Sequence, residues 1–284
     1  MSRLDSKLWG STRRMIWMVV VFKIGGRVMN TVFNGPALDD FSQATHGTQT
    51  VLVHGGGDTV TGIAEKLGVQ QKFVTSPEGF RSRYTDEETI QVFTMVMAGK
   101  INKEIVRQLQ SRKVPALGLS GPDGALIRAE RKKKLIVMDE RGRKRVIEGG
   151  YTGKVTNVDA SLLRTLITAG YLPIIAPIAL GLESEPLNLD GDRTAAYVAG
   201  ALQADQLILL TDVAGVSIEG EVKPRLSAEE AKSNLSKIGP GMVTKVYAAL
   251  EALTMGVKKV MISSGRLDNP FTSALQENGT LILP

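Results

Sequence analysis

Short apolar runs rich in β-branched residues alternate along the chain with longer amphipathic segments. Each run precedes a glycine-rich or polar turn, so it predicts a buried strand. The predicted strands are Val19–Ile24, Thr50–Val53, Ile174–Ala176, Gln206–Leu210 and Val260–Ile262. The predicted helices are Asp86–Ser111, Asp159–Ala169, Arg193–Leu202 and Pro240–Met255. This alternation predicts an α/β fold, a three-layer sandwich with a mostly parallel central sheet.

Residues 117–155 interrupt the alternation. They contain short strand-like segments, a turn signal at Glu140-Arg-Gly-Arg and a glycine-rich end at Gly149-Gly-Tyr-Thr-Gly. A β-hairpin excursion explains this pattern better than a new domain. With 284 residues and no low-complexity linker, we expect a single domain over residues 1–284, divided near residue 180 into two lobes.

The first apolar run follows Lys7, Arg13 and Arg14, in the order of a short signal peptide. It continues directly into Lys23-Ile-Gly-Gly without a small-residue cleavage site, and it is too short to span a bilayer. We therefore expect a buried first strand, an optional extension over residues 1–14, and no membrane contact.

The composition excludes several kinds of site. The chain has no cysteine and two histidines, His46 and His54. Disulfides, thiolate metal ligands and a cysteine nucleophile are excluded, and the scarcity of histidine argues against zinc. We predict no metal held by the protein itself, and Mg²⁺ as the ion that arrives with a nucleotide.

Positive charge is concentrated in one segment. The net charge is +6, and the segment Arg128–Arg145 holds nine Lys/Arg against three Asp/Glu, which equals the excess of the whole chain. Such a patch suits an acidic protein or a nucleic acid, or it is a solvated hairpin with charged faces.

Two glycine-rich turns follow the first two predicted strands: Lys23-Ile-Gly-Gly and His54-Gly-Gly-Gly. Glycines let backbone amides approach an anion, and parallel strands hold ligands at their carboxyl ends. The first turn alone is equally compatible with a plain strand-to-helix turn. Dinucleotide-binding and P-loop fingerprints are both missing.

Polar residues also stand where later elements begin or end. Asn188-Leu-Asp190-Gly-Asp192 precedes a predicted helix, where Asp192 is either an N-cap or a functional carboxylate. Thr211-Asp-Val-Ala-Gly215 closes a predicted strand. Lys245 lies in the first turns of a helix, where a bound anion would offset the unfavourable helix dipole, although a solvated lysine is the alternative.

Taken in order, these motifs resemble the amino acid kinase family, specifically its acetylglutamate kinase branch. The resemblance extends from about Val19 to the C-terminus. The motifs are Lys23-x-Gly-Gly, His54-Gly-Gly-Gly, Arg83-Tyr-Thr-Asp, Asn188-x-Asp-x-Asp192, Thr211-Asp-Val-x-Gly and Gly241-Met-Val-Thr-Lys245. It implies an ATP-dependent kinase that phosphorylates a side-chain carboxylate, with ATP as co-substrate.

The resemblance also implies residue roles. Lys23 and Lys245 would stabilise the transferring phosphoryl group, and Asp192 would hold both lysines. Substrate contacts would come from Gly56, Gly57, Arg83 and Asn188. Nucleotide contacts would come from Gly25, Gly26, Thr211, Asp212, Val213 and Gly215. Residues 15–180 would then form the amino-acid-substrate lobe and residues 181–284 the nucleotide-binding lobe.

Such a reaction suits a histidine-poor chain. A side-chain carboxylate with a pKa near ~4.3 is already ionised at neutral pH, so no general base is required. The obstacle is repulsion between this anion and ATP, which fixed positive charges and oriented amides overcome.

A finer resemblance is to archaeal-type kinases acting on 2-aminoadipate or glutamate attached to a LysW-type carrier protein. It rests on Gly79-Phe-Arg-Ser-Arg-Tyr-Thr-Asp86 and Gly149-Gly-Tyr-Thr-Gly-Lys154, whereas ordinary acetylglutamate kinases carry an acidic residue in place of Lys154 and lack the arginine pair. It implies carrier contacts from Arg81, Tyr151 and Lys154. It also implies a small acidic carrier that suits the basic patch, a homodimer, and a cytoplasmic location.

Two other functions remain open. A kinase acting on free N-acetylglutamate would share every catalytic residue above. A non-catalytic regulator that senses an amino acid or binds nucleic acid is a different class, but no helix-turn-helix or RNA-binding aromatic motif accompanies the basic patch. Aminoadipate and glutamate differ by one methylene, and both remain candidate substrates.

Overall fold

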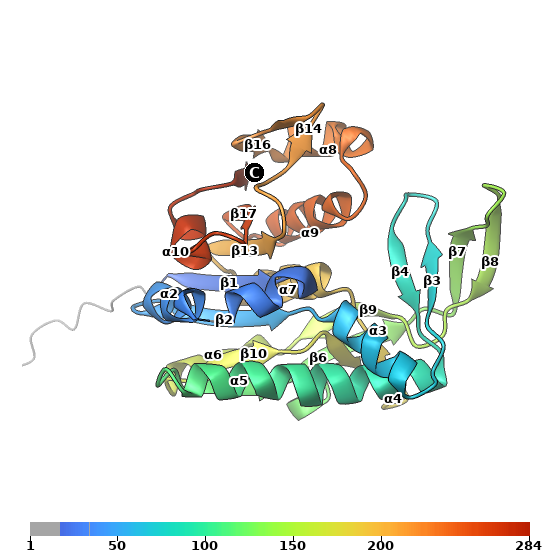
Figure 1. Cartoon of the computed structure of the whole chain (residues 1–284), viewed down its shortest axis with the longest axis horizontal. Coiled ribbons are helices and arrows are strands. Elements are labelled where there is room, and N and C mark those ends of the chain that lie inside the picture. Colours follow the sequence, from blue (N-terminus) through green and yellow to red (C-terminus); the bar gives the residue numbers. More distant parts are fainter. Residues whose placement is uncertain (1–17, 34) are drawn as a thin grey trace, which may run out of the picture.

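The computed structural model describes residues 18–33 and 35–284, so the predicted extension over residues 1–14 lies outside the described part. An eight-stranded sheet runs through both halves of the chain (Figure 1), in the order β16-β18-β17-β13-β1-β2-β10-β5. In that order the strands are Arg225–Ser227, Thr280–Leu283, Lys259–Ser264, Gln206–Thr211, Val19–Ile24, Gln49–His54, Leu172–Ile175 and Ala116–Leu119. Neighbours are parallel except β17 and β18, which confirms the predicted mostly parallel sheet.

The alternation of side chains along each strand explains the three layers. In β1, Val21 belongs to one buried cluster, whereas Val20 and Phe22 belong to the other. The first cluster is completed by α6 (Ala160–Thr168), α7 (Gly191–Leu202) and α9 (Met242–Thr254). The second is completed by α2 (Pro36–Thr45), α5 (Asn102–Gln110) and α10 (Pro270–Leu275). Both faces of the sheet are therefore covered, as parallel sheets require.

Short elements complete the connections between these layers. They are η1 (Gly26–Val28), α1 (Met29–Val32), α3 (Gly57–Lys66), α4 (Glu87–Thr94), α8 (Ala228–Ser233) and η4 (Leu235–Lys237). Between α4 and α5 lies the π-helical segment η2 (Met95–Ile101), so the predicted helix Asp86–Ser111 exists but is not uniformly α-helical. Within residues 18–33 and 35–284, no helix is long and apolar enough to cross a membrane.

Smaller sheets stand beside the main one. β12-β11-β6-β9 forms a four-stranded sheet from Pro186–Asn188, Ile178–Leu180, Ile127–Arg131 and Gly153–Val158. Three two-stranded pairs are β3 with β4 (Lys72–Thr75, Arg81–Tyr84), β7 with β8 (Lys134–Met138, Lys144–Glu148) and β14 with β15 (Ser217–Ile218, Glu221–Val222). The β3–β4 and β7–β8 hairpins stand next to each other on one side of the molecule (Figure 1).

These elements refine the prediction for residues 117–155. The hairpin with its turn at Glu140–Arg143 is present as β7–β8. The excursion starts later than expected, because β5 pairs with β10 and is the edge strand of the main sheet. The β3–β4 hairpin was not predicted because its strands are short and largely exposed, and the second sheet was not predicted because β11 and β12 have only three residues each.

Candidate active site

The two glycine-rich turns meet at the carboxyl ends of β1 and β2. The register places Ile24 beside His54, and the amide of Gly55 donates to the carbonyl of Ile24 at 2.8 Å. A Cβ added to Gly26 would lie 3.2 Å from the nitrogen of Gly56. The turns therefore pack against each other through their backbones, which requires residues without side chains.

A buried triad lies above these turns. One carboxylate oxygen of Asp192 lies 2.7 Å from Lys23 Nζ, and the other lies 2.9 Å from Lys245 Nζ. The three side chains are 6%, 7% and 14% exposed for Asp192, Lys23 and Lys245. Lys23 comes from β1, Asp192 from the first turn of α7 and Lys245 from the first turns of α9. Lys23 and Lys245 are 222 positions apart in the sequence, and the fold brings both of them to Asp192.

The charges of the triad support one another. Burial opposes ionisation of Asp192, but Lys23 and Lys245 outweigh it and hold the pKa of Asp192 well below its ordinary value. Burial also opposes the charge of Lys245, yet Asp192 raises its pKa on balance. For Lys23 burial dominates and lowers the pKa, despite the same carboxylate. The Asp192 carboxylate therefore offsets part of the effect of burial on the pKa of Lys23.

The start of α7 corrects one alternative for Asp192. The N-cap is Asp190, whose carboxylate accepts a hydrogen bond from the amide of Arg193 at 2.9 Å. Asp192 lies inside the first helical turn and contacts the two lysines instead. The N-capping interpretation of Asp192 is therefore wrong, and a separate residue performs that role.

Two helices begin at this site without a side-chain cap. α3 follows Gly56, whose φ is +143°, and α9 follows Gly241, whose φ is +84°. Neither glycine offers a side-chain acceptor to the first amides of its helix. The positive ends of both helices are thus available to an anionic ligand.

Arg83 and Asn188, predicted to contact substrate, are engaged with the protein in this structure. Arg83 Nη2 donates to the carbonyl of Gly57 at 2.8 Å and to Thr61 Oγ1 at 2.9 Å, and Nη1 contacts Gln71. Asn188 Nδ2 donates to Thr85 Oγ1 at 2.8 Å. Arg83 therefore fixes the start of α3, and Asn188 fixes the end of the β3–β4 hairpin.

The residues predicted to contact a carrier surround the same hairpin. The guanidinium of Arg81 stacks 4.4 Å from the ring of Phe73 on β3. The amide of Tyr151 donates to the carbonyl of Thr85 at 2.7 Å, and Arg131 lies 4.2 Å above the ring of Tyr151. Lys154 is exposed on β9. Thr85, which the sequence analysis missed as a site residue, joins Tyr151 to Asn188.

The predicted nucleotide residues lie at the carboxyl end of β13. The amide of Gly25 donates to the carbonyl of Leu210 at 3.1 Å, next to Thr211. Asp212 Oδ2 pairs with Arg27 Nη1 at 3.0 Å, which joins this loop to the first glycine turn. Val213 is 47% exposed. Packing alone explains a glycine at position 215, because a Cβ there would lie 2.5 Å from Thr280 Oγ1.

No metal cluster belongs to this site. Across residues 18–33 and 35–284, no group of three His, Asp or Glu side chains is arranged to hold an ion. Both oxygens of Asp192 are occupied by lysines, so this carboxylate is unsuited to be a metal ligand.

His54 is buried beneath the second turn and is not a general base. Its Nδ1 lies 2.9 Å from the carbonyl of Gly55 and therefore carries a proton, while Nε2 accepts from Asn102 Nδ2 at 3.2 Å. Burial lowers the pKa of His54 to about 4, and Lys103 and Lys23 disfavour a second proton further. This geometry makes His54 a packed residue that orients the second turn.

This pKa predicts how stability depends on pH. Between pH 6.5 and about 4 the unfolded chain binds a proton at His54 that the folded chain does not. The free energy of unfolding therefore decreases as the pH is lowered from 6.5 to about 4. The total loss is about 3 kcal/mol. An NMR titration of the imidazole nitrogens, with His46→Gln to remove the other histidine, would show His54 neutral at pH 5. Titration near pH 6.5 would contradict the assignment.

Comparison with known proteins gives three findings. Residues 18–264 match the model of the amino acid kinase family. A LysW-aminoadipate/LysW-glutamate kinase from Saccharolobus islandicus is 47% identical over 93% of this chain and 99% of its own. A relative from Cenarchaeum symbiosum, which carries the same name provisionally, is 51% identical with the same coverage.

A solved structure shows the same fold. The N-acetylglutamate synthase from Neisseria gonorrhoeae, crystallised with coenzyme A and N-acetyl-glutamate, superposes with a TM-score of 0.75 at 26% identity. The match covers 94% of this chain and 59% of the synthase.

Proposed function

The chain belongs to the amino acid kinase family, and on that premise we propose that it transfers the γ-phosphoryl group of ATP to a side-chain carboxylate. The acceptor is 2-aminoadipate or glutamate attached through its amino group to a LysW-type acidic carrier protein. The observation that carries the proposal is the buried Lys23–Asp192–Lys245 triad, which holds two ammonium groups on one carboxylate beside two glycine turns.

The triad supplies what this reaction needs. An ionised carboxylate oxygen of the substrate attacks the γ-phosphorus of ATP, the bond from phosphorus to the β,γ-bridging oxygen breaks, and ADP leaves. No proton is transferred, because the nucleophile is already ionised. Negative charge on the transferring group is stabilised by Lys23 and Lys245 and by the amide of Gly26, while the amide of Gly25 is held by the carbonyl of Leu210 and fixes the turn. Asp192 holds the lysines so that they do not reorganise during the reaction.

The other site residues take roles on either side of this centre. We assign the amino-acid substrate to Gly56, Gly57, Arg83 and Asn188, where α3 begins and the β3–β4 hairpin ends. We assign the nucleotide to the end of β13, at Thr211, Asp212, Val213 and Gly215. Mg²⁺ would arrive with the nucleotide and would supply positive charge to its phosphates.

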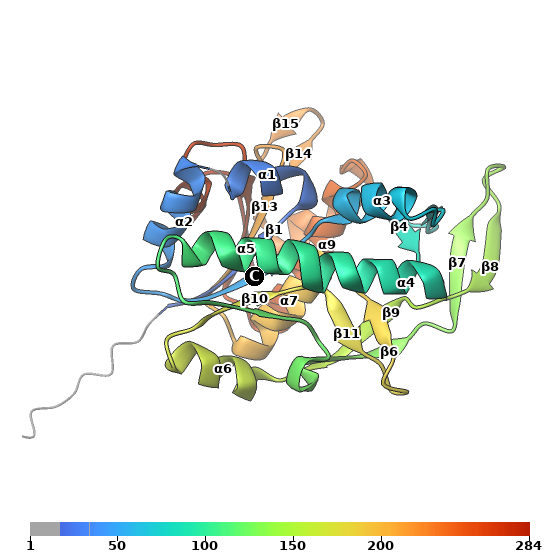
Figure 2. The same ribbon diagram turned by 60° about the horizontal axis from the view of Figure 1, so that its bottom comes forward.

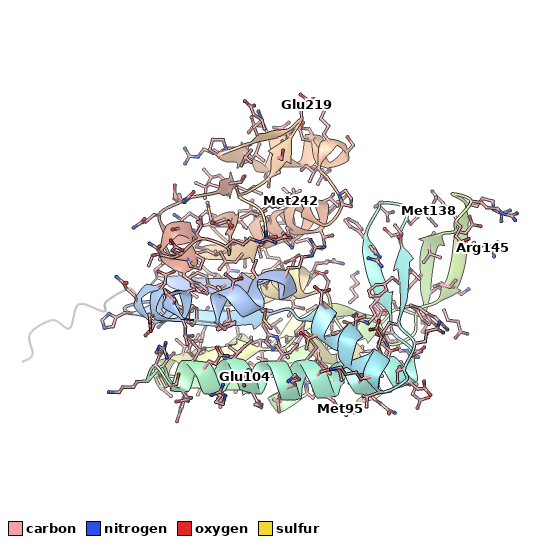
Figure 3. The ribbon with its side chains drawn as sticks, in the orientation of Figure 1. Met95, Glu104, Met138, Arg145, Glu219 and Met242 are labelled. Atoms are coloured by element: carbon pink, nitrogen blue, oxygen red, sulfur yellow. The ribbon has the colours of Figure 1, made fainter. Side chains whose placement is uncertain are left out.

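The carrier-bound substrate is supported by the names of two relatives and by the hairpins. Arg81 lies on β4 of the β3–β4 hairpin, Tyr151 is bonded to Thr85 at the end of the same hairpin, and Lys154 is exposed on β9. The β7–β8 hairpin stands beside the β3–β4 hairpin and exposes Lys134 and Lys144 (Figure 3 labels Arg145 on the same hairpin). A basic rim of this kind steers an acidic carrier toward the substrate pocket. We further expect a homodimer in the cytoplasm.

A kinase that acts on free N-acetylglutamate is the second candidate, since the fold resembles a synthase crystallised with N-acetyl-glutamate. A non-catalytic regulator is disfavoured, because a regulator has no need to keep two buried lysines on one buried aspartate.

Phosphorylation of both substrate forms discriminates these candidates. We expect kcat/KM for the carrier-bound amino acid to exceed that for free N-acetylglutamate by at least ~100-fold, measured as ATP turnover, because carrier contacts add binding energy. The double variant Lys134→Glu/Lys144→Glu should raise the KM for the carrier-bound substrate about tenfold and leave turnover of the free compound unchanged.

A matched reversal controls for net charge. Lys113→Glu/Lys232→Glu changes two other exposed lysines, at the end of α5 and on α8, and should leave both substrates unaffected. Robust activity on free N-acetylglutamate, equal to that on the carrier-bound substrate, would contradict the carrier proposal while leaving the kinase assignment intact.

A further inference from the structure

The helix that crosses beneath the glycine turns changes its pitch at one place. α4 and α5 form one continuous helix interrupted by the π-helical segment η2, whose end is marked by the amide of Asn102 bonding to the carbonyl of Met97. The buried pair Val96 and Met97 is followed by the buried pair Ile101 and Asn102, each five residues on. An α-helix would have turned Lys100 and Ile101 inward instead.

The outer face of this segment agrees with that description. Met95 is 58% exposed and points away from the body of the molecule (Figure 3). Figure 2 shows the continuous helix crossing the molecule with α3 beside it. The π turn thus rotates α5 so that two specific side chains, Ile101 and Asn102, face the carboxyl end of β2.

Ile101 supports the glycine turn from below. A Cβ added to Gly56 would lie 2.2 Å from Ile101 Cδ1 and 3.2 Å from Met97 Sδ. The backbone of Gly56 is therefore in direct contact with the π segment.

Asn102 makes a polar connection next to this contact. Its Nδ2 donates to the carbonyl of Ile174 on β10 at 2.9 Å and to His54 Nε2 at 3.2 Å. Its Oδ1 accepts from Lys103 Nζ at 3.1 Å, which fixes the orientation of the amide. His54 in turn holds the carbonyl of Gly55. With 1% of its surface exposed, Asn102 uses both amide hydrogens inside the protein.

We propose that Asn102, placed by the π turn, is a positioning residue that holds the glycine loop His54–Gly57 in its substrate-binding conformation through His54. The inference rests on the proposed function, because this loop carries the substrate contacts of Gly56 and Gly57. The amide is suited to the task because it donates twice, to a strand carbonyl and to a neutral imidazole. An aspartate or leucine of similar shape leaves both acceptors without a donor.

The test compares KM values for the two substrates. Asn102→Leu should raise the KM for the amino-acid substrate at least tenfold and leave the KM for ATP within twofold. Thr94→Val is the matched control on the same helix, because the Thr94 hydroxyl is buried without a hydrogen-bond partner in the described residues. It should change neither KM.

The variant Asn102→Asp provides a second measurement, the pH dependence of the amino-acid KM, which would not change if Asn102 had only a structural role. In Asn102→Asp the carboxylate faces His54 Nε2 and favours a second proton on the imidazole, against Lys23 and Lys103. Protonated Nε2 then donates to the carboxylate and restores the connection to the loop. The amino-acid KM of Asn102→Asp, relative to wild type, should therefore fall at least threefold between pH 8.5 and pH 5. A ratio independent of pH would overturn the proposal.

The results of these experiments distinguish a failure of the proposed function from a failure of the role proposed for Asn102. Absence of phosphorylation by the wild-type protein, with carrier-bound and acetylated substrates alike, contradicts the proposed function. Wild-type activity with an unchanged amino-acid KM in Asn102→Leu contradicts only the role of Asn102. If Asn102→Leu does not fold, the pH series of Asn102→Asp decides the question.

Discussion

Asp192→Asn is expected to lower kcat by about two to three orders of magnitude, the cost of losing one preorganised electrostatic element of an active site. The change removes the charge that holds Lys23 Nζ at 2.7 Å and Lys245 Nζ at 2.9 Å. Because burial already lowers the pKa of Lys23, loss of the carboxylate lowers this pKa further and weakens the hold of Lys23 on its proton. The two ammonium groups are then no longer fixed in place for the transferring phosphoryl group.

Stability should fall together with kcat in this variant. Removing one partner of a buried ion pair costs about 3–5 kcal/mol, since the remaining charges stay buried without compensation. The measurement is single-turnover phosphoryl transfer together with urea unfolding. Asp205→Asn is the control: its ion pair with Lys258 lies on the surface before β13, so kcat should be unchanged and stability should fall by less than about 1 kcal/mol. Wild-type kcat in Asp192→Asn would contradict the mechanism.

Gly56→Ala is expected to reduce kcat/KM for the amino-acid substrate by at least ~100-fold, corresponding to about 2.7 kcal/mol of lost transition-state stabilisation. The φ of Gly56 is +143°, a conformation that side chains disfavour, and the new methyl group would lie 2.2 Å from Ile101 Cδ1. Either the Ile101 side chain or the backbone of Gly56 must move, and the disfavoured φ adds strain at the start of α3.

A glycine in the same helix provides the comparison. Gly62 lies in α3, and a Cβ there meets nothing within 4 Å. Gly62→Ala should leave kinetics unchanged and raise stability by about 0.5–1 kcal/mol, because alanine loses less backbone entropy than glycine in a helix. Equal kinetic effects of the two substitutions would contradict the role assigned to the loop at Gly56.

The sequence predicted most of the central sheet because its strands are buried on both faces. Val19–Ile24 and Gln206–Leu210 are continuous apolar runs followed by polar turns, and such runs are distinctive. The β3–β4 hairpin escaped prediction because Lys72–Thr75 and Arg81–Tyr84 are short and mix polar with apolar residues. Their pairing depends on cross-strand contacts that periodicity does not record.

The residues of the triad could be predicted from the sequence, but the residue that supports the glycine loop could not. Lys23, Asp192 and Lys245 stand in glycine-rich or capping contexts, which family resemblance also marks. Asn102 gave no such signal, because an asparagine in an amphipathic helix normally faces solvent. The π turn produces a five-residue spacing of buried pairs, and this spacing places Asn102 in the interior. The sequence does not show the spacing, because it becomes visible only when the burial of each residue is known. The division into lobes at residue 180 stays a prediction.

The most direct test of the proposed function is to trap the product with hydroxylamine, which converts an acyl phosphate into a hydroxamate. Purified protein, ATP, Mg²⁺ and the carrier-bound amino acid should give ADP and hydroxamate in equal amounts, and Asp192→Asn should slow the formation of both by about two to three orders of magnitude. Formation of ADP without hydroxamate, or no reaction with either the carrier-bound or the acetylated amino acid, would contradict phosphorylation of a side-chain carboxylate.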